Sequence, residues 1–147
     1  MFDFDWQHER VSWNPGYETG VPVLDREHAS LLERINDVDE AITRGDGIGA
    51  IMGRIEILRR DSLDHFDHEE ALMRQAGYPN AESHARLHSN LIAMISDLLE
   101  QARSGDRAAL QRGAAEVLKT WLVSHLLGAD RAYSDVMSEP FQVGSAA

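Results

Sequence analysis

The sequence of 147 residues contains no cysteine. This absence excludes disulfide scaffolds, cysteine-ligated zinc, thiolate-bound iron–sulfur clusters and cysteine nucleophiles. Positive charge is also scarce, because 14 Lys and Arg stand against 25 Asp and Glu and leave a formal net charge of −11. Binding of nucleic acid depends on clustered Lys and Arg that neutralise phosphates. We therefore expect no nucleic-acid partner.

Long apolar runs are absent as well. None approaches the roughly 18 residues of a membrane-spanning helix. The first ten residues, MFDFDWQHER, have neither the basic nor the apolar region of a secretory signal. We therefore expect a cytoplasmic protein without membrane insertion. With 43% hydrophobic and 27% charged residues, the composition is typical of one globular domain.

Proline and glycine are few and fall in groups, and between the groups lie four segments with the apolar periodicity of helices. These segments are 25–44, 48–75, 81–103 and 107–137. Asp25, Asn80 and Asp106 are suited to cap the first, third and fourth. On the third segment, Leu87 and Leu99 are expected to point inward together with Leu91, Ile95 and Leu98.

The short connections and the absence of strand alternation predict an all-α fold. Consecutive helices with short connections are antiparallel neighbours, so we expect an up-down-up-down four-helix bundle. The expected organisation is an N-terminal arm at 1–23 packing on the bundle, the bundle itself at 24–139, and a flexible C-terminal tail at 140–147.

What the sequence has in unusual number is histidine, with seven residues. Five of them and two carboxylates fall on the predicted apolar faces: His28, His65, Glu69, His84, His88, His125 and Asp130. They come early in the first and third helices and late in the second and fourth, which are positions at the same end of such a bundle. A single core histidine is usually a hydrogen-bonded structural residue. A buried layer of five imidazoles and two carboxylates is hard to satisfy in that way, and a metal would satisfy it.

Seven ligands exceed one coordination sphere and suit two cations bridged by Glu69 and Asp130. Imidazole with carboxylate fits iron, zinc or manganese, whereas calcium and magnesium prefer oxygen ligands. Five histidines divide into three and two, so one metal has a vacant position for a small exogenous ligand.

The same residues form a pattern that resembles the hemerythrin family, particularly its single-domain bacterial forms, over about residues 13–133. The pattern consists of His28, His65-Phe66-x-x-Glu69-Glu70, Tyr78-Pro79, His84-x-x-x-His88, Trp121-Leu122-x-x-His125-x-x-x-x-Asp130 and Tyr133. The resemblance implies two iron ions per chain with a bridging oxo or hydroxo group. One iron would be held by His84, His88 and His125, and the other by His28 and His65 with an open position.

The resemblance also implies dioxygen as the ligand, with azide or other small anions in the oxidised form. An apolar pocket for the oxygen would be lined by Leu31, Phe66, Trp121, Leu122 and Leu126. The expected function is oxygen binding, transport or storage, and not enzymatic. The alternatives are an oxygen or redox sensor acting on a partner in trans, or a di-iron enzyme acting on oxygen, peroxide or nitric oxide. Such enzymes typically use carboxylate-rich ligand sets with Glu-x-x-His pairs, which the seven residues do not contain.

The sequence allows alternative interpretations for three features of the site. His125 and Asp130 are five residues apart, which an ideal α-helix places about 140° apart. Either the Asp130 side chain approaches the site from the side of an ordinary α-helix, or the helix has a wide turn near Gly128. Asp61 is suited to accept the ring N–H of a ligand histidine, or else is a solvated surface residue. His68 is expected to be exposed, or to support the ligands, and not to be a ligand itself.

Overall fold

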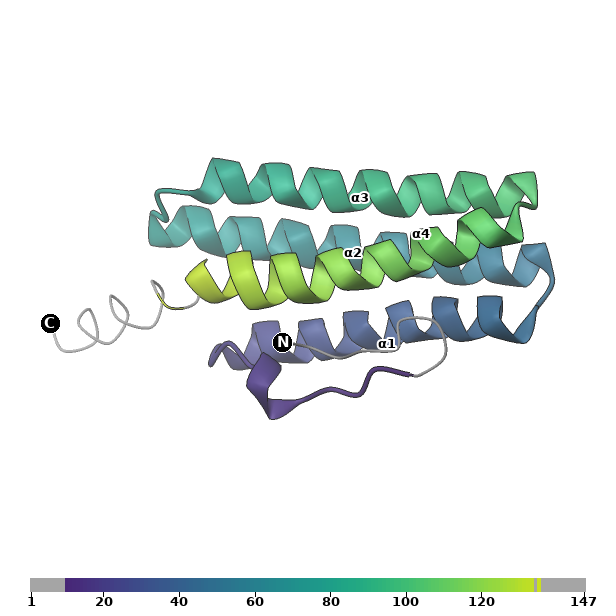
Figure 1. Ribbon diagram of the computed structural model, residues 1–147. Helices are drawn as coiled ribbons and strands as arrows, with labels where there is room; N and C mark the ends of the chain where they lie inside the picture. The colour runs from purple at the N-terminus through teal and green to yellow at the C-terminus, as the bar shows by residue number, and fades with distance from the viewer. Residues whose placement is uncertain (1–9, 134, 136–147) are drawn as a thin grey trace, which may run out of the picture.

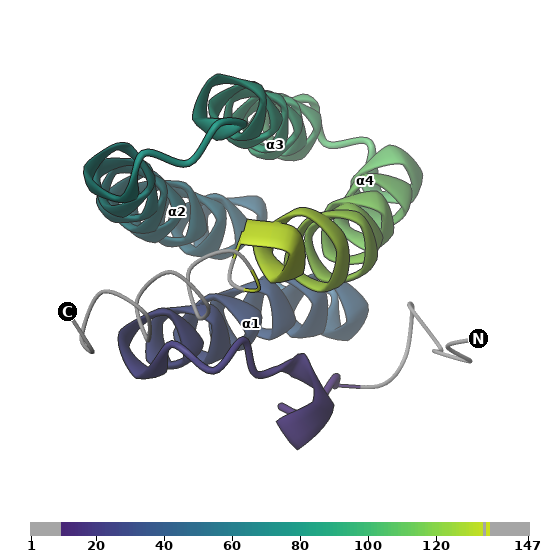
Figure 2. The same ribbon diagram turned by 90° about the vertical axis from the view of Figure 1, so that its left-hand side faces the viewer.

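The computed structural model describes residues 10–133 and 135, and this part of the chain is built from antiparallel helices (Figure 1). The elements that make the bundle are α1 (Pro22–Arg44), α2 (Ile48–Ala76), α3 (Ala81–Ser104), α4 (Arg107–Lys119) and the π-helix η2 (Thr120–Asp130). η2 continues α4 directly, so the two form one rod. Each rod contacts its sequence neighbours, and α1 also contacts α4, which closes the ring seen end-on in Figure 2. The predicted all-α bundle is confirmed.

The helix ends follow from local chemistry. Gly45 and Gly77 end α1 and α2 with φ of 73° and 69°, a left-handed conformation that glycine adopts at little cost. Asp106 caps α4, as expected, because its side chain accepts a hydrogen bond from the Ala109 backbone N–H at 3.0 Å. The short connections set each helix antiparallel to the next, and this brings the start of α1, the end of α2, the start of α3 and the end of η2 together at one end of the bundle (Figure 1).

The predicted start of the first helix is wrong by three residues. α1 begins at Pro22, where the missing N–H of proline costs no helical hydrogen bond. Asp25 therefore lies inside the first turn and does not cap the helix. Its carboxylate accepts hydrogen bonds from the Thr19 backbone N–H and hydroxyl, at 2.7 and 2.8 Å, and so fixes the chain that leads into α1.

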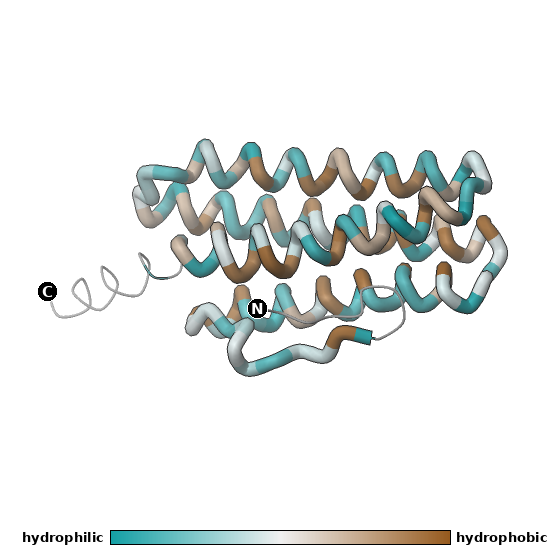
Figure 3. The backbone as a smooth tube through the Cα atoms, in the orientation of Figure 1, coloured by the Kyte–Doolittle hydropathy of each residue, from teal (hydrophilic) through white to brown (hydrophobic). Residues whose placement is uncertain are grey.

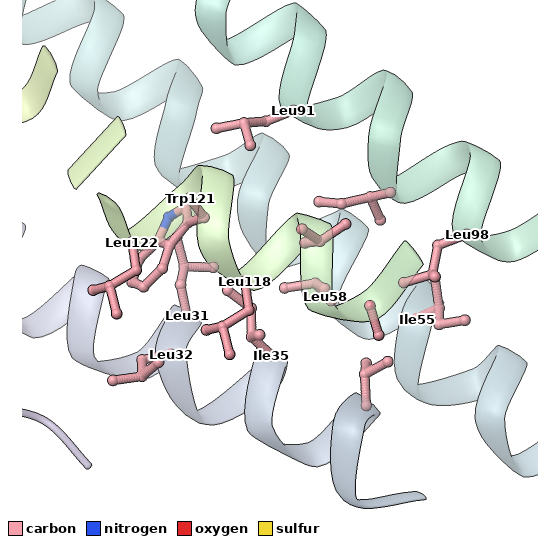
Figure 4. Packing of buried hydrophobic residues seen from close by; sticks show 14 of the residues in the cluster. Leu31, Leu32, Ile35, Ile55, Leu58, Leu91, Leu98, Leu118, Trp121 and Leu122 are labelled. Atoms are coloured by element: carbon pink, nitrogen blue, oxygen red, sulfur yellow. The ribbon is translucent and has the colours of Figure 1, made fainter. Parts of the chain in front are cut away.

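The core follows the predicted stripes, apart from two leucines at the edges of the α3 stripe. Apolar positions recur along every helix (Figure 3), and their side chains interdigitate between the rods (Figure 4). The labelled core members are Leu31, Leu32, Ile35, Ile55, Leu58, Leu91, Leu98, Leu118, Trp121 and Leu122. Leu87 is 41% exposed, contrary to expectation, and Leu99 is only partly buried. Both lie about 60° from the centre of the α3 stripe, so they sit at its edges.

The described part of the N-terminal arm packs along α1. Val11 and Tyr17 are buried. The side chain of Asn36 in α1 forms hydrogen bonds with both the N–H and the carbonyl of Val11. The Asn36 side-chain oxygen accepts from the Val11 N–H at 2.9 Å, and its amide donates to the Val11 carbonyl at 2.7 Å. Arg10 forms ion pairs with Glu33, Asp37 and Glu40 of α1 in the same region. Because α1 begins at Pro22, Pro22 and Val23 belong to the helix and not to the predicted arm. The predicted tail at 140–147 lies outside the described residues.

We expect Asn36→Ala to release the arm. The substitution leaves a buried N–H and a buried carbonyl of Val11 without partners, which costs about 1–3 kcal/mol for each group that stays buried. Urea unfolding measures the stability, and trypsin cleavage after Arg10 measures arm release. Asn90→Ala, at an exposed position of α3, is the control and should change stability by less than about 0.5 kcal/mol. Equal effects of the two substitutions would contradict the assignment.

Among the described residues, no helix combines the length and apolarity needed to cross a membrane.

Candidate metal centre

The seven predicted ligand residues meet at the end of the bundle where α1 begins and η2 ends. Their ligand atoms form two groups, in each of which all atoms lie within 4.8 Å of one another. One group contains Glu69, His84, His88, His125 and Asp130, and the other contains His28, His65, Glu69 and Asp130. Each of the seven residues is at most 4% exposed. The two carboxylates belong to both groups, so the side chains form two adjacent candidate metal sites that share Glu69 and Asp130.

The helices place these side chains by simple spacing. His65 and Glu69 of α2 are four residues apart and share a face, and His84 and His88 repeat this spacing at the start of α3. His28 lies in the second turn of α1. The same-end arrangement expected from the sequence is therefore what the fold produces.

The π-helix η2 resolves the spacing of His125 and Asp130. A π-helix pairs residues five apart, so His125 and Asp130 lie on one face of η2 and both point into the bundle. Of the two interpretations, the wide turn is correct. It extends over all of Thr120–Asp130 and is not confined to a single turn near Gly128.

The Glu69 carboxylate divides its oxygens between the two groups. Its Oε1 lies 3.1 Å from His84 Nε2 and 3.0 Å from His88 Nε2. Its Oε2 lies 3.5 Å from both His28 Nε2 and His65 Nε2. One oxygen thus faces the three-histidine group and the other faces the two-histidine group, which is the arrangement a bridging carboxylate needs.

Asp130 is divided in the same way. Its Oδ1 lies 2.8 Å from His84 Nε2 and 3.1 Å from His125 Nε2, on the three-histidine side. Its Oδ2 lies 3.2 Å from His28 Nε2, on the two-histidine side. All five imidazoles therefore present Nε2 to the centre.

Hydrogen bonds within the described chain do not satisfy this centre. Among the described residues His28 Nδ1 has no hydrogen-bond partner, and neither do six buried atoms that face the centre: Nε2 of His28, His65 and His125, Oε2 of Glu69, and Oδ1 and Oδ2 of Asp130. They lie close to other polar atoms, but with poor alignment, because all point toward common centres. An unsatisfied buried polar atom costs about 1–3 kcal/mol. The donor set, imidazole nitrogen with carboxylate oxygen, fits iron and other borderline cations, which would satisfy these atoms together.

In the absence of a metal, bound protons satisfy some of the buried polar atoms of the centre. Burial opposes ionisation of Glu69, but the four surrounding imidazoles outweigh burial and hold the pKa of its carboxyl well below the usual value. Burial likewise opposes protonation of His28 and His84, yet the Asp130 and Glu69 carboxylates raise the pKa of each histidine to about 9. Near neutral pH the negative charges of Glu69 and Asp130 are therefore compensated by protons on these two histidines. Metal binding would displace these protons.

Two further carboxylates contact imidazole rings of the centre from outside it. His65 Nδ1 lies 2.6 Å from Glu27 Oε1, and His88 Nδ1 lies 2.8 Å from Glu70 Oε2. Of the two interpretations of Asp61, the surface residue is correct, because its partly exposed carboxylate pairs with Arg34 at 3.2 Å and not with a histidine of the centre. Glu27 had no role in the sequence interpretation, although its position next to His28 on α1 was a usable signal.

His68 is not among the seven grouped residues, in agreement with the prediction. Its side chain is 40% exposed. Its Nδ1 lies 2.8 Å from Glu27 Oε2, and the other oxygen of Glu27 contacts His65.

The residues predicted to line an oxygen pocket are all buried around the centre. Figure 4 shows Leu31, Trp121 and Leu122, which belong to one hydrophobic core with Phe66 and Leu126. The Phe66 ring stacks on His88 with centroids 4.0 Å apart, and Trp121 lies edge-on to His28 at 6.3 Å. A pocket role for these residues stays a prediction.

A surface cavity of about 210 Å³ lies beside the two-histidine group. It is lined by Glu27, Ser30, Leu31, Asp61, Asp64 and His65. The two-histidine side of the centre therefore lies nearer to this opening, with His65 between the cavity and the centre.

Comparison with known proteins agrees with this geometry. Residues 19–135 match the family model described as "Hemerythrin HHE cation binding domain", and the chain belongs to this hemerythrin family. It is 30% identical over 125 residues to a bacteriohemerythrin of Pseudomonas aeruginosa, covering 85% of this chain and 80% of that protein. It is 26% identical over 125 residues to the myohemerythrin of Theromyzon tessulatum, covering 85% and 92% of the two chains. A bacteriohemerythrin of Methylococcus capsulatus is 24% identical over 129 residues, with 87% and 97% covered.

Proposed function

We propose that this protein binds dioxygen reversibly at a pair of iron ions held by the seven buried residues. The observation that carries the proposal is the division of both carboxylates between two groups of imidazoles. His84, His88 and His125 would hold one iron, and His28 and His65 the other. Glu69 and Asp130 would bridge, with a solvent-derived oxo or hydroxo group as the third bridge. The relatives are named hemerythrins, and the family description as a cation-binding domain supports the metal.

Held by these residues, a pair of ferrous ions would supply the two electrons that reversible binding of dioxygen requires. The two-histidine side offers one side-chain ligand fewer, which leaves a position for dioxygen, or for azide and similar anions in the oxidised form. The buried apolar side chains of Leu31, Leu122 and Leu126 would limit the access of water to this position. They provide no proton donor, so they favour binding over oxygen activation. The histidine-rich ligand set favours the same outcome.

A sensor acting on a partner in trans is the second candidate, and one contact favours it. Arg131, which directly follows Asp130, donates hydrogen bonds to the backbone carbonyls of Gly16 and Glu18 at 2.6 and 3.1 Å. The end of the ligand-bearing helix is thereby joined to the N-terminal arm. A change at the centre that displaces Asp130 would reach the surface of the molecule through this contact.

The test is a cycle of oxygenation and purging. The ferrous-loaded protein is mixed with oxygenated buffer in a stopped-flow instrument, and the visible spectrum is followed before and after argon purging. We expect a new absorption band that disappears under argon and returns with oxygen over repeated cycles. An irreversible change on the first mixing would contradict reversible binding.

Metal loading should also stabilise the fold. A ligand present at 100 times its dissociation constant stabilises by about 2.7 kcal/mol, so two ions contribute about 5 kcal/mol. In a chain of this size the melting temperature should rise by more than about 10 °C. Calorimetry of metal-free and ferrous-loaded protein under argon measures the shift. Calcium and magnesium, which prefer oxygen ligands, are the controls and should shift it little. A similar shift with calcium would contradict the imidazole-based site.

A further inference from the structure

We propose that Glu27 is the positioning residue of the two-histidine half of the centre, and that His68 holds Glu27 in place. This inference rests on the proposed two-metal site. Glu27 lies on α1, one residue before His28, and faces α2. Its two carboxylate oxygens are divided between two histidines of α2, with Oε1 at 2.6 Å from His65 Nδ1 and Oε2 at 2.8 Å from His68 Nδ1.

The contact with His65 determines what this ring presents to the centre. A carboxylate only accepts hydrogen bonds, so His65 must carry its proton on Nδ1. The opposite nitrogen, Nε2, is then unprotonated when the ring is neutral and presents its lone pair. This nitrogen is buried, has no hydrogen-bond partner among the described residues, and lies 3.5 Å from Glu69 Oε2. Glu27 therefore fixes both the tautomer and the orientation that metal ligation needs.

The contact with His68 determines where Glu27 itself lies. Glu27 is about one-third exposed and lines the surface cavity, so its side chain has other rotamers available in solvent. His68 is three residues after His65 and offers its Nδ1 to the second oxygen. With both oxygens engaged, the carboxylate is held in one position. A half-exposed histidine outside the seven ligands thus influences a buried ligand through one carboxylate.

A different carboxylate orients a histidine ring in each half of the centre. In the three-histidine half, His88 has its own carboxylate partner in Glu70, at 2.8 Å. Glu70 lies on α2, whereas Glu27 lies on α1, and each touches one ligand ring. Removing Glu27 should therefore weaken one metal position and leave the other largely unchanged. Removing Glu70 should have the opposite effect.

The experiment is a titration of metal-free protein with Co(II), whose absorption spectrum reports on each bound ion and needs no oxygen chemistry. The parent should bind two ions, the first at the group with more side-chain ligands. In Glu27→Ala we expect the affinity of the second step to fall about 10- to 100-fold with the first step unchanged. Glu70→Ala should weaken the first step. His28→Ala, which removes a ligand of the two-histidine half, identifies the step that belongs to it.

Three further variants separate positioning from charge. Asp64→Asn removes a carboxylate from the same cavity, and it should leave both steps within about twofold of the parent. His68→Ala should weaken the second step by about 3- to 10-fold, the effect of one hydrogen bond. His68→Gln retains an N–H donor for Glu27 and should restore most of this loss.

A second readout follows the ring proton itself. In the Co(II)-loaded parent, the His65 Nδ1 proton should give a paramagnetically shifted NMR signal protected from water by Glu27. In Glu27→Ala this signal should be lost through exchange with solvent. A parent that binds fewer than two ions contradicts the proposed function itself. Two ions in the parent, with an unchanged second step in Glu27→Ala or equal losses in Glu27→Ala and Asp64→Asn, overturn the positioning role alone.

Discussion

Glu69→Ala should abolish the dinuclear centre and leave less than one iron per chain. Glu69 has one oxygen facing each group of imidazoles, so its removal takes a ligand from both ions at once. It also removes half of the carboxylate charge that compensates the two cations, and uncompensated buried charge is costly. Iron analysis after anaerobic ferrous loading and gel filtration measures the effect. Asp130→Ala should behave in the same way.

His28→Ala is the matched control, because this residue is equally buried but belongs to one group only. We expect it to keep part of the metal, held by the three-histidine group. Circular dichroism of the metal-free variants shows whether each still folds. Full iron occupancy and parental oxygen spectra in Glu69→Ala would contradict its bridging role.

Leu122→Ala should keep both irons but shorten the lifetime of the oxygenated form. Leu122 is fully buried on η2, three residues before His125. Its truncation opens space for water and anions next to the two-histidine side, and it costs about 2–5 kcal/mol of stability, part of which the metal offsets. A tenfold faster decay in air corresponds to only about 1.4 kcal/mol in the barrier. We expect at least this change, and a further acceleration by azide. Leu126→Asn, which introduces a polar group at the same wall, should act likewise.

Leu98→Ala separates the pocket effect from lost packing. Leu98 is equally buried on α3, toward the opposite end of the bundle (Figure 4). It should lose comparable stability while its oxygenated form decays at the parental rate. If Leu122→Ala decays no faster than Leu98→Ala, and azide has no effect, these leucines serve packing alone.

The sequence was sufficient for the bundle and for the convergence of the seven polar residues. Both depend on helical periodicity and on short connections, which make neighbouring helices antiparallel. Periodicity also explains the misplaced Leu87, since a residue about 60° off the stripe lies at the boundary between core and solvent. The start of α1 at Pro22 was missed because Asp25 has the side chain of a typical cap, yet its carboxylate binds Thr19 instead.

Two features of the site depend on three-dimensional detail that spacing does not encode. The i, i+5 separation of His125 and Asp130 left two geometries open, and only the backbone of η2 shows that the helix widens over its whole length. The partner of His65 depends on how α1 and α2 pack. Asp61 lies on the same helix as His65, but Arg34 engages it, whereas Glu27 reaches His65 across the interface. The contacts between α1 and α2 therefore determine which carboxylate orients His65.

The central claim, reversible binding of dioxygen by a pair of irons, is tested most directly by measuring the oxygen itself. Ferrous-loaded protein of known iron content is equilibrated with oxygen, separated from free oxygen and purged with argon, and the released gas is quantified. We expect one dioxygen to be recovered for every two irons, unchanged over repeated cycles. Oxygen that is consumed without recovery, or a ratio of one dioxygen per iron, would contradict it.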